Sequence, residues 1–138
     1  MTRITGLEFR AESGPGSRMQ WNHRGSGHVQ VTVDGPDVFF QEAFTLDNGL
    51  PCQDRKCWHF GEEGIIFRHF REQRFQDILL LVPDTSGIHL VAQTPYSCPP
   101  DRYDGSLSLH ADTLELQLRI TGARKDEDIR YRYRADPG

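Results

Sequence analysis

The stretch HVQVTVDGPDVFFQEAFTL, residues 28–46, carries the clearest structural signal in the chain. Val29, Val31 and Val33 alternate with polar side chains, and a second apolar run follows the DGPD turn at residues 34–37. Alternation with a period of two places successive side chains on opposite faces of a β-strand. Asp, Gly and Pro between two such runs are typical of a turn. The stretch therefore predicts two antiparallel strands joined by a tight turn.

The same alternation recurs along the rest of the chain, and no segment has the 3.6-residue apolar spacing of an amphipathic helix. Even spacing of about eight to ten short strands predicts an all-β protein built as a single antiparallel up-and-down β-barrel, because closure removes exposed strand edges. A two-sheet sandwich is the main alternative. A small barrel has room for one small ligand. The other expected strands are residues 55–60, 65–73, 75–83, 88–94, 106–111, 113–121 and 128–134.

Composition and charge limit the classes of function. The chain has 138 residues, with 16 Lys and Arg against 20 Asp and Glu and a formal net charge of −4. This balance argues against a nucleic-acid partner bound through its phosphates. Arg130, Arg132 and Arg134 alternate along one strand, and we interpret them as a solvated strand face. No apolar run approaches the roughly 18 residues that cross a bilayer, so we expect no membrane partner.

The N-terminal segment and the cysteines bear on domain organisation and location. Residues 1–17 have no apolar run typical of a signal peptide and end in SGPGS. We therefore expect a flexible segment over residues 1–17 and one barrel domain over residues 18–138. Three cysteines are an odd number without a disulfide-scaffold pattern, which favours free thiols in a reducing compartment, the cytoplasm.

A zinc site is one chemistry that the cysteines suggest. Cys52, Cys57 and His59 form a C-x4-C-x-H pattern, and Cys98 is available as a fourth ligand. Cys52 nevertheless sits in a loop, and no second pair matches the first. We expect neither a metal ion nor a cofactor.

Nucleophilic catalysis by Cys98 is the second chemistry to consider. A partner histidine (His69, His59 or His89) would lower the pKa of the thiol. However, no helix begins after Cys98, and Pro99 keeps the residue before it extended. A small residue at a rigid corner is the simpler interpretation.

Five stretches, taken in order, resemble a bacterial and fungal family of unknown function. The resemblance covers residues 20–134 approximately and implies a calycin-type, lipocalin-like β-barrel. Because the family has no known activity, it implies a fold and site residues but no reaction. The stretches are WNHRGSGHVQV (21–31), CWHF (57–60), IFRHFR (66–71), CPPDRYDG (98–105) and RITGARKDEDIRYRYR (119–134).

The family motifs can be carried over to particular positions. Glu42 takes the glutamate of an E-x-G segment, Trp58 the tryptophan of an R-W pair, and His69 with Arg71 the H-x-R strand. The final motifs, H-x-C-x-x-D-x-Y-x-G and G-P-[RK]-K, fall on Cys98, Asp101, Tyr103, Gly105, Gly122, Arg124 and Lys125.

The chain departs from these motifs in three places. Ser97 stands where the motif has a histidine, and Ala123 replaces a proline. Lys56 precedes Trp58 with Cys57 between them. The serine weakens any mechanism that needs a histidine at that corner.

A polar cluster inside the barrel is the candidate site. His69 and Arg71 project to one face of their strand, and Asp101 and Tyr103 have the same spacing. If these faces point inward, polar groups converge among aromatic side chains, as in many ligand sites. An Arg71–Asp101 network that only pins the strand order is the structural alternative. The ligand-binding residues expected from spacing and from the resemblance are Phe40, Glu42, Trp58, Phe67, His69, Arg71, Asp101, Tyr103, Lys125, Tyr131 and Tyr133.

The leading functional hypothesis is binding of a small, mostly apolar molecule with a polar or anionic group. Arg71 would hold that group, because a guanidinium clamps carboxylates. The alternative is a cofactor-free enzyme (isomerase, cyclase or hydrolase), with His69, Tyr103 and Asp101 in acid–base roles. A third class is a structural or interaction protein, and we expect a monomer or a homodimer.

Overall fold

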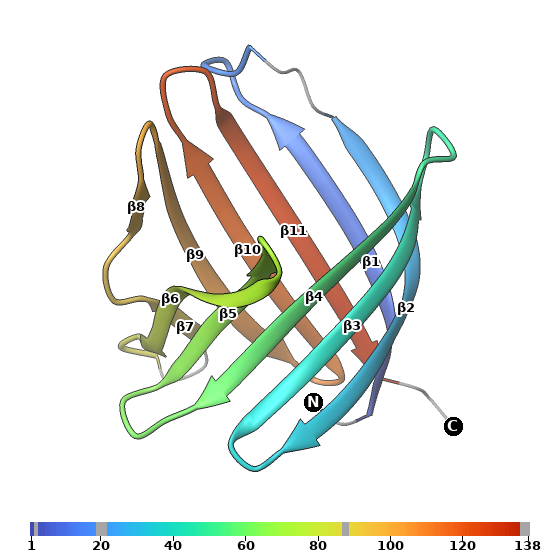
Figure 1. The fold of residues 1–138 in the computed structure, drawn as a ribbon, viewed down its shortest axis with the longest axis vertical. Helices are drawn as coiled ribbons and strands as arrows, with labels where there is room; N and C mark the ends of the chain where they lie inside the picture. The colour runs from blue at the N-terminus through green and yellow to red at the C-terminus, as the bar shows by residue number, and fades with distance from the viewer. Residues whose placement is uncertain (2, 19–21, 87–88, 136–138) are drawn as a thin grey trace.

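A computed structural model describes residues 1, 3–18, 22–86 and 89–135 of the chain. Trp21 of the first family stretch and Ile88 of the expected strand 88–94 lie outside the described residues. No helix long and apolar enough to span a membrane occurs in the described ranges. The strands (Figure 1) are β1 (Ile4–Ser13), β2 (His23–Asp34), β3 (Asp37–Leu46), β4 (Pro51–Phe60), β5 (Ile65–Arg71), β6 (Arg74–Pro83), β7 (His89–Ala92), β8 (Tyr96–Cys98), β9 (Asp101–His110), β10 (Thr113–Thr121) and β11 (Asp126–Ala135).

The sheet closes on itself. Its strand order is β10-β11-β1-β2-β3-β4-β5-β6-β7-β9, and β9 pairs again with β10, so ten strands form a ring. Every pair is antiparallel, and β8 adds to the same edge of β9 that β7 uses. The predicted all-β, antiparallel, up-and-down barrel is confirmed. The sandwich alternative is wrong, because the ring of hydrogen-bonded strands is continuous.

The prediction of a flexible N-terminal segment is wrong for Ile4–Ser13, which form β1. This strand pairs with β11 on one side and with β2 on the other, so it is a necessary part of the ring. Its own alternation, with Leu7, Phe9 and Ala11 buried, supplies one stripe of the interior. Even the following SGPGS stretch is tied to β11, because the Gly14 amide donates to the Asp126 carbonyl over 2.6 Å.

The interior has a tightly packed middle. We call it the central layer, and its members keep at most 1% of their surface exposed. The upper end of the barrel in Figure 1 carries the β10–β11 turn, and the lower end carries the β2–β3 turn. The central layer separates these ends and consists of Phe40, Glu42, Lys56, Trp58, Phe67, Leu81, Leu116 and Tyr133.

Close approach of β2 and β3 requires glycine at one position in the wall. A Cβ on Gly27 would lie 2.0 Å from the Ala43 carbonyl oxygen and 2.5 Å from Phe44 Cα. Both atoms belong to the backbone and cannot rotate away. Gly27 therefore lets Phe44 of β3 turn inward beside β2.

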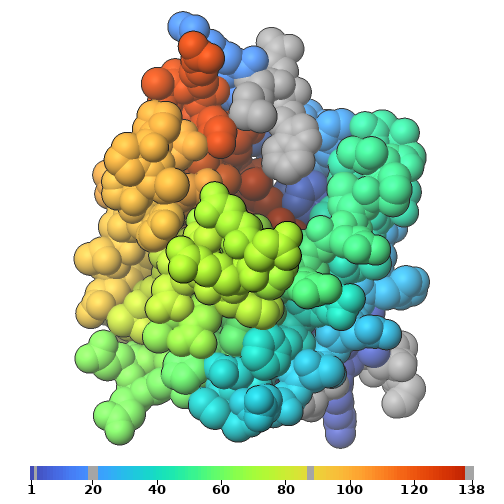
Figure 2. All heavy atoms as spheres, in the orientation of Figure 1, coloured from blue at the N-terminus to red at the C-terminus, as the bar shows by residue number. Residues whose placement is uncertain are grey.

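The β5–β6 hairpin leaves the ring at the upper end. Pairing of β4 with β5 stops at His69, and β6 pairs with β7 only from Leu81 onward. Phe75 instead packs on Phe39 of β3, with ring centroids 5.5 Å apart. The hairpin tip therefore bends away from the neighbouring strands (Figure 1), and the surface above this turn is hollowed (Figure 2). His69 and Arg71 belong to the end of β5 that leads into this turn, next to the opening.

Candidate functional site

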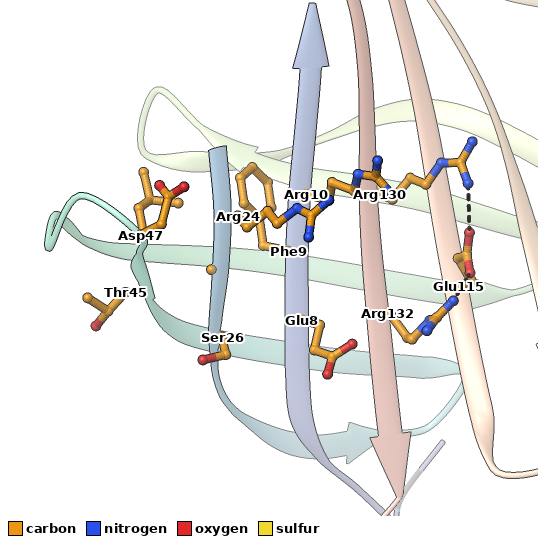
Figure 3. Close-up of a pocket in the computed structure, with 12 residues that line it drawn as sticks. Glu8, Phe9, Arg10, Arg24, Ser26, Thr45, Asp47, Glu115, Arg130 and Arg132 are labelled. Carbon is orange, nitrogen blue, oxygen red and sulfur yellow. Dashed lines mark ion pairs between the residues drawn. The ribbon is translucent and has the colours of Figure 1, made fainter. Parts of the chain in front are cut away.

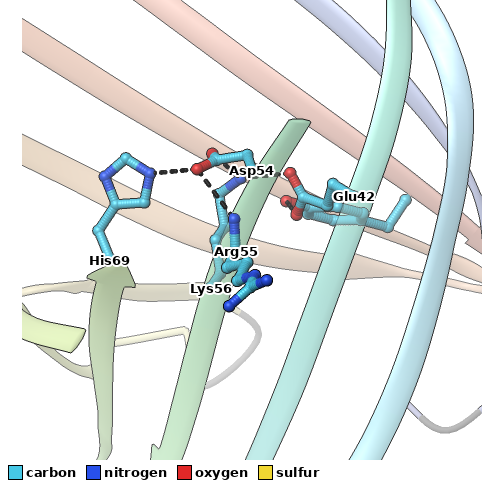
Figure 4. Close-up of polar contacts among 6 residues, drawn as sticks. Glu42, Asp54, Arg55, Lys56 and His69 are labelled. Carbon is cyan, nitrogen blue, oxygen red and sulfur yellow. Dashed lines mark hydrogen bonds and ion pairs between the residues drawn. The ribbon is translucent and has the colours of Figure 1, made fainter. Parts of the chain in front are cut away.

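A buried lysine holds the middle of the barrel together. Lys56 Nζ donates to Glu42 Oε1 over 2.6 Å and to Asp54 Oδ2 over 3.0 Å (Figure 4). The Tyr133 hydroxyl donates to the second Glu42 oxygen over 2.6 Å. The ring of Tyr131 faces the ammonium, with Nζ 3.5 Å from the ring centroid. Each charge in this network thus has a partner, as buried charges require.

Strand geometry explains why these groups meet. Asp54, Lys56 and Trp58 alternate along β4 and so share its inward face. Asp54 lies directly opposite Glu42 of β3, and Lys56 lies directly opposite His69 of β5. Tyr133 belongs to β11, on the far side of β1 and β2, so its bond to Glu42 crosses the interior.

The network also fixes protonation states. Burial alone would raise the pKa of Asp54, but the Lys56 ammonium and the hydrogen bond with His69 lower it to about 2. Burial alone would lower the pKa of Lys56, but Glu42 above all raises it above its usual value. Burial raises the pKa of both Tyr131 and Tyr133. At neutral pH the site therefore holds a fixed ammonium, a fixed Asp54 carboxylate and two phenols.

The network reaches solvent at His69. Side-chain exposure is 0% for Lys56 and Glu42, 17% for Asp54 and 27% for His69. His69 Nε2 lies 2.6 Å from Asp54 Oδ1, so the ring N–H donates a hydrogen bond to the carboxylate. The other ring nitrogen, Nδ1, has no hydrogen-bond partner within the described part of the chain. His69 therefore presents a free, oriented nitrogen at the opening.

Arg71 lies beside His69 but does not make the contact expected of it. Its guanidinium carbon is 5.7 Å from the centre of the Tyr103 ring, across the opening. Asp101 instead pairs with Lys125, whose Nζ lies 3.0 Å from Asp101 Oδ2. The hydrogen bond to Asp101 raises the pKa of Lys125, although burial opposes it. The structural alternative, an Arg71–Asp101 network, is therefore wrong, because Asp101 pairs with Lys125. Arg71 Nε is buried without a partner among the described residues.

The aromatic residues expected as a ligand wall belong to the central layer. Trp58 packs against Phe40 and Phe67, with ring centroids 5.7 and 5.1 Å apart. Its indole Nε1 is buried and has no hydrogen-bond partner in the described ranges. These side chains, with Tyr133, form the floor beneath the polar network.

Sequence reasoning missed Asp54 and Lys56. The sequence could have indicated their position, because Asp54 and Lys56 alternate with Trp58 along β4 and so lie on the same face of the strand. Sequence reasoning named Lys56 only as a departure from the family's R-W pair and did not predict that it lies inside the barrel. Charged residues at inward positions are normally rare, so parity alone gave no reason to place them inside.

The cysteines do not form a site in the described residues. All three are free thiols, and Cys57 is buried, which raises its pKa to about 11. His59 Nδ1 lies 2.6 Å from Asp37 Oδ1. His59 is on the opposite face of β4 from Trp58 and the central layer. No group of three or more metal-ligating side chains occurs within the described ranges.

Two cavities lie outside the polar site. One, of about 870 Å³, opens at the lower end and is mostly apolar. The other, of about 770 Å³, is a groove on the outer face of β1, β2 and β11 (Figure 3). Its arginines include Arg130 and Arg132, which lie 3.9 and 3.5 Å from Glu115. Neither cavity is lined by a residue of the sequence-predicted site.

Residues 14–135 match the model of DUF6314, a family of unknown function. The chain belongs to this family. The family resemblance inferred from the sequence is thus confirmed. No curated protein matches the chain. Among solved structures, a de novo designed fluorescence-activating β-barrel is similar with a TM-score of 0.50 and 13% identity, over 95% of this chain and 91% of that one. At this identity the likeness shows the fold alone.

We expect Lys56→Met to destabilise this DUF6314 protein by about 3–5 kcal/mol, because Glu42 and Asp54 would keep buried charges without a counter-ion. Urea unfolding would measure the loss. The double variant Lys56→Met/Glu42→Gln should recover part of it, since one stranded charge is removed. Equal stabilities of the single variant and the wild type would contradict a structural role for the ion pair.

The pKa of Asp54 predicts an acid-sensitive contribution to stability. The fall of the Asp54 pKa from 3.8 to about 2 corresponds to a contribution of about 2 kcal/mol to the free energy of unfolding. Because the folded-state pKa is depressed, this contribution is present above pH 4 approximately and is lost as the pH falls towards 2. Urea midpoints of wild type and Asp54→Asn should therefore differ at pH 6 and converge at pH 2. A difference independent of pH would contradict the assignment.

Proposed function

We propose that the barrel binds a small, mostly apolar molecule with an anionic group in its upper half. Arg71 carries this proposal, because its buried Nε has no partner among the described residues and its guanidinium lies over the Tyr103 ring, 5.7 Å from the ring centre. A carboxylate would satisfy that guanidinium through charge-assisted hydrogen bonds. His69 would add a donor or acceptor through its free Nδ1. Tyr103 and the Asp101–Lys125 pair would orient the ligand from β9 and the β10–β11 turn.

Apolar side chains above the central layer would receive the body of the molecule. Phe44, Leu118 and Ile129 point inward there and keep 7–8% of their surface exposed, against 0% for Trp58 and Tyr133 below. Figure 2 agrees with this difference, because the surface is hollowed above the β5–β6 turn and atoms of β11 are visible inside. The central layer would act as the floor, so its Phe40, Glu42 and Phe67 would shape the site from below. Tyr131, whose ring faces the Lys56 ammonium, would contribute beside them.

Substitution of Arg71 tests the binding proposal. Titration with a library of apolar carboxylates, followed by calorimetry, should find ligands whose affinity falls about ten-fold or more in Arg71→Gln. Arg74→Gln is the matched control, because Arg74 is exposed and lies opposite Arg71 across the same turn. Equal effects of the two substitutions, or no binding by wild type, would reject the proposal.

A cofactor-free enzyme is the second candidate, favoured by the contact between His69 and Asp54. A carboxylate that stays ionised holds the imidazole in one orientation and leaves Nδ1 to accept a proton from a bound molecule. Tyr103 would supply a phenol on the opposite side of the opening. The same pocket would then turn over the acid that it binds.

Mass spectrometry of the bound ligand after incubation separates these candidates. If the protein is an enzyme, wild type converts the ligand, and His69→Gln abolishes conversion while the melting temperature stays nearly unchanged. Recovery of the unchanged ligand from wild type would reject the enzyme proposal and retain only the binding proposal.

A further inference from the structure

The cavity at the lower end of the barrel is a mostly apolar pocket that opens to solvent. Its volume is about 870 Å³, which lies within the range of small-molecule pockets. Two residues further along the same strands, Phe40, Phe67 and Leu116 keep 0–1% exposure. The central layer therefore closes the cavity from above. Its inner wall consists of Ile4, Val38, Ile65, Leu90, Leu107 and Leu114.

Exposed apolar side chains surround the entrance. The described residues include five large hydrophobic side chains that are exposed, and Val33, Phe60 and Leu109 among them line this cavity. Their exposures are 55%, 45% and 59%, and they come from β2, β4 and β9. Single exposed hydrophobics are ordinary, but a cluster around a pocket marks a binding surface.

The turns beside this entrance carry an excess of negative charge. Asp34 follows Val33, and Glu62 and Glu63 lie in the turn between β4 and β5. Asp112 lines the cavity itself, as do Arg3 and Met1. Asp112 is thus the one carboxylate among the described lining residues, and three more lie shortly after the lining residues Val33 and Phe60 in the chain. Against these four carboxylates stand the Arg3 guanidinium and the Met1 amino group, which line the cavity.

We propose that the lower cavity binds an amphiphilic cation, with its hydrocarbon part inside and its ammonium group at the acidic rim. The depth and apolar wall suit a slim chain or ring, which can pass the rim and reach Leu107 and Leu114. The carboxylates favour a cation over an anion with the same chain. This site shares no residue with the upper one, so it goes beyond the function proposed above.

Three probes with one chain and different head groups test the charge preference. Decylammonium, decanol and decanoate would be titrated below their aggregation concentrations into the full chain by calorimetry. We expect decylammonium to bind about ten-fold tighter than decanoate at low salt, and the ratio to shrink in high salt. The titrations would be repeated with Arg71→Gln, so that failure of the upper site leaves this ratio unchanged.

Rim substitutions locate the site. Leu109→Lys and Val33→Lys should each weaken decylammonium binding about ten-fold or more, because they remove apolar contact and add like charge. Leu50→Lys is the matched control, since Leu50 is 55% exposed but lies at the upper end outside the cavity. Melting temperatures would verify that each variant folds.

Three results would overturn the proposal. One is decanoate binding as tightly as decylammonium at the lower site. Another is equal binding by the rim variants and Leu50→Lys. The third is a wild-type dimer that Leu109→Lys converts to a monomer with no probe bound, which would make this face an interface between copies of the chain.

Discussion

The enclosure of the Lys56 ammonium is the constraint on which the interior depends. An unpaired ion at this depth would cost several kcal/mol, so the surrounding strands must deliver carboxylates to it. Glu42 arrives from β3 and Asp54 from β4 itself, and Tyr133 of β11 binds the far oxygen of Glu42. One cation therefore ties together strands on opposite sides of the barrel, and it does so only in one register.

This constraint divides the barrel into two compartments with different chemistry. Around the ion pair, Trp58 and other large side chains pack without exposed surface and close the middle. Above it, the network continues through Asp54 to His69 and meets Arg71 and Tyr103 at an opening. Below it, the cavity is apolar and its rim is acidic. The two sites proposed here would therefore lie on opposite sides of the central layer and share no residue.

Family membership does not choose between these uses, because DUF6314 has no known function and a β-barrel supports many. The choice depends on individual groups. A buried guanidinium nitrogen without a partner among the described residues is a costly arrangement in a packed protein. A ligand that satisfies Arg71 would remove this cost, and His69, held in one orientation by Asp54, lies beside it. The upper opening is therefore the stronger candidate for the main function.

The sequence by itself determined most of the strands and which side chains share a face of each, because the period-two alternation is a local property of the chain. It predicted the closed antiparallel ring and showed that His69 and Arg71 share one face of their strand, as Tyr131 and Tyr133 share one face of theirs. Sequence reasoning did not predict β1, because the SGPGS stretch that follows it suggested a flexible linker over residues 1–17.

Only the tertiary structure decided which inward groups meet. Asp101 pairs with Lys125 rather than Arg71, and Glu42 of β3 reaches Tyr133 of β11. These contacts depend on strand register and on how the ring of strands closes. Both are set by packing between segments far apart in the sequence, which no local pattern records.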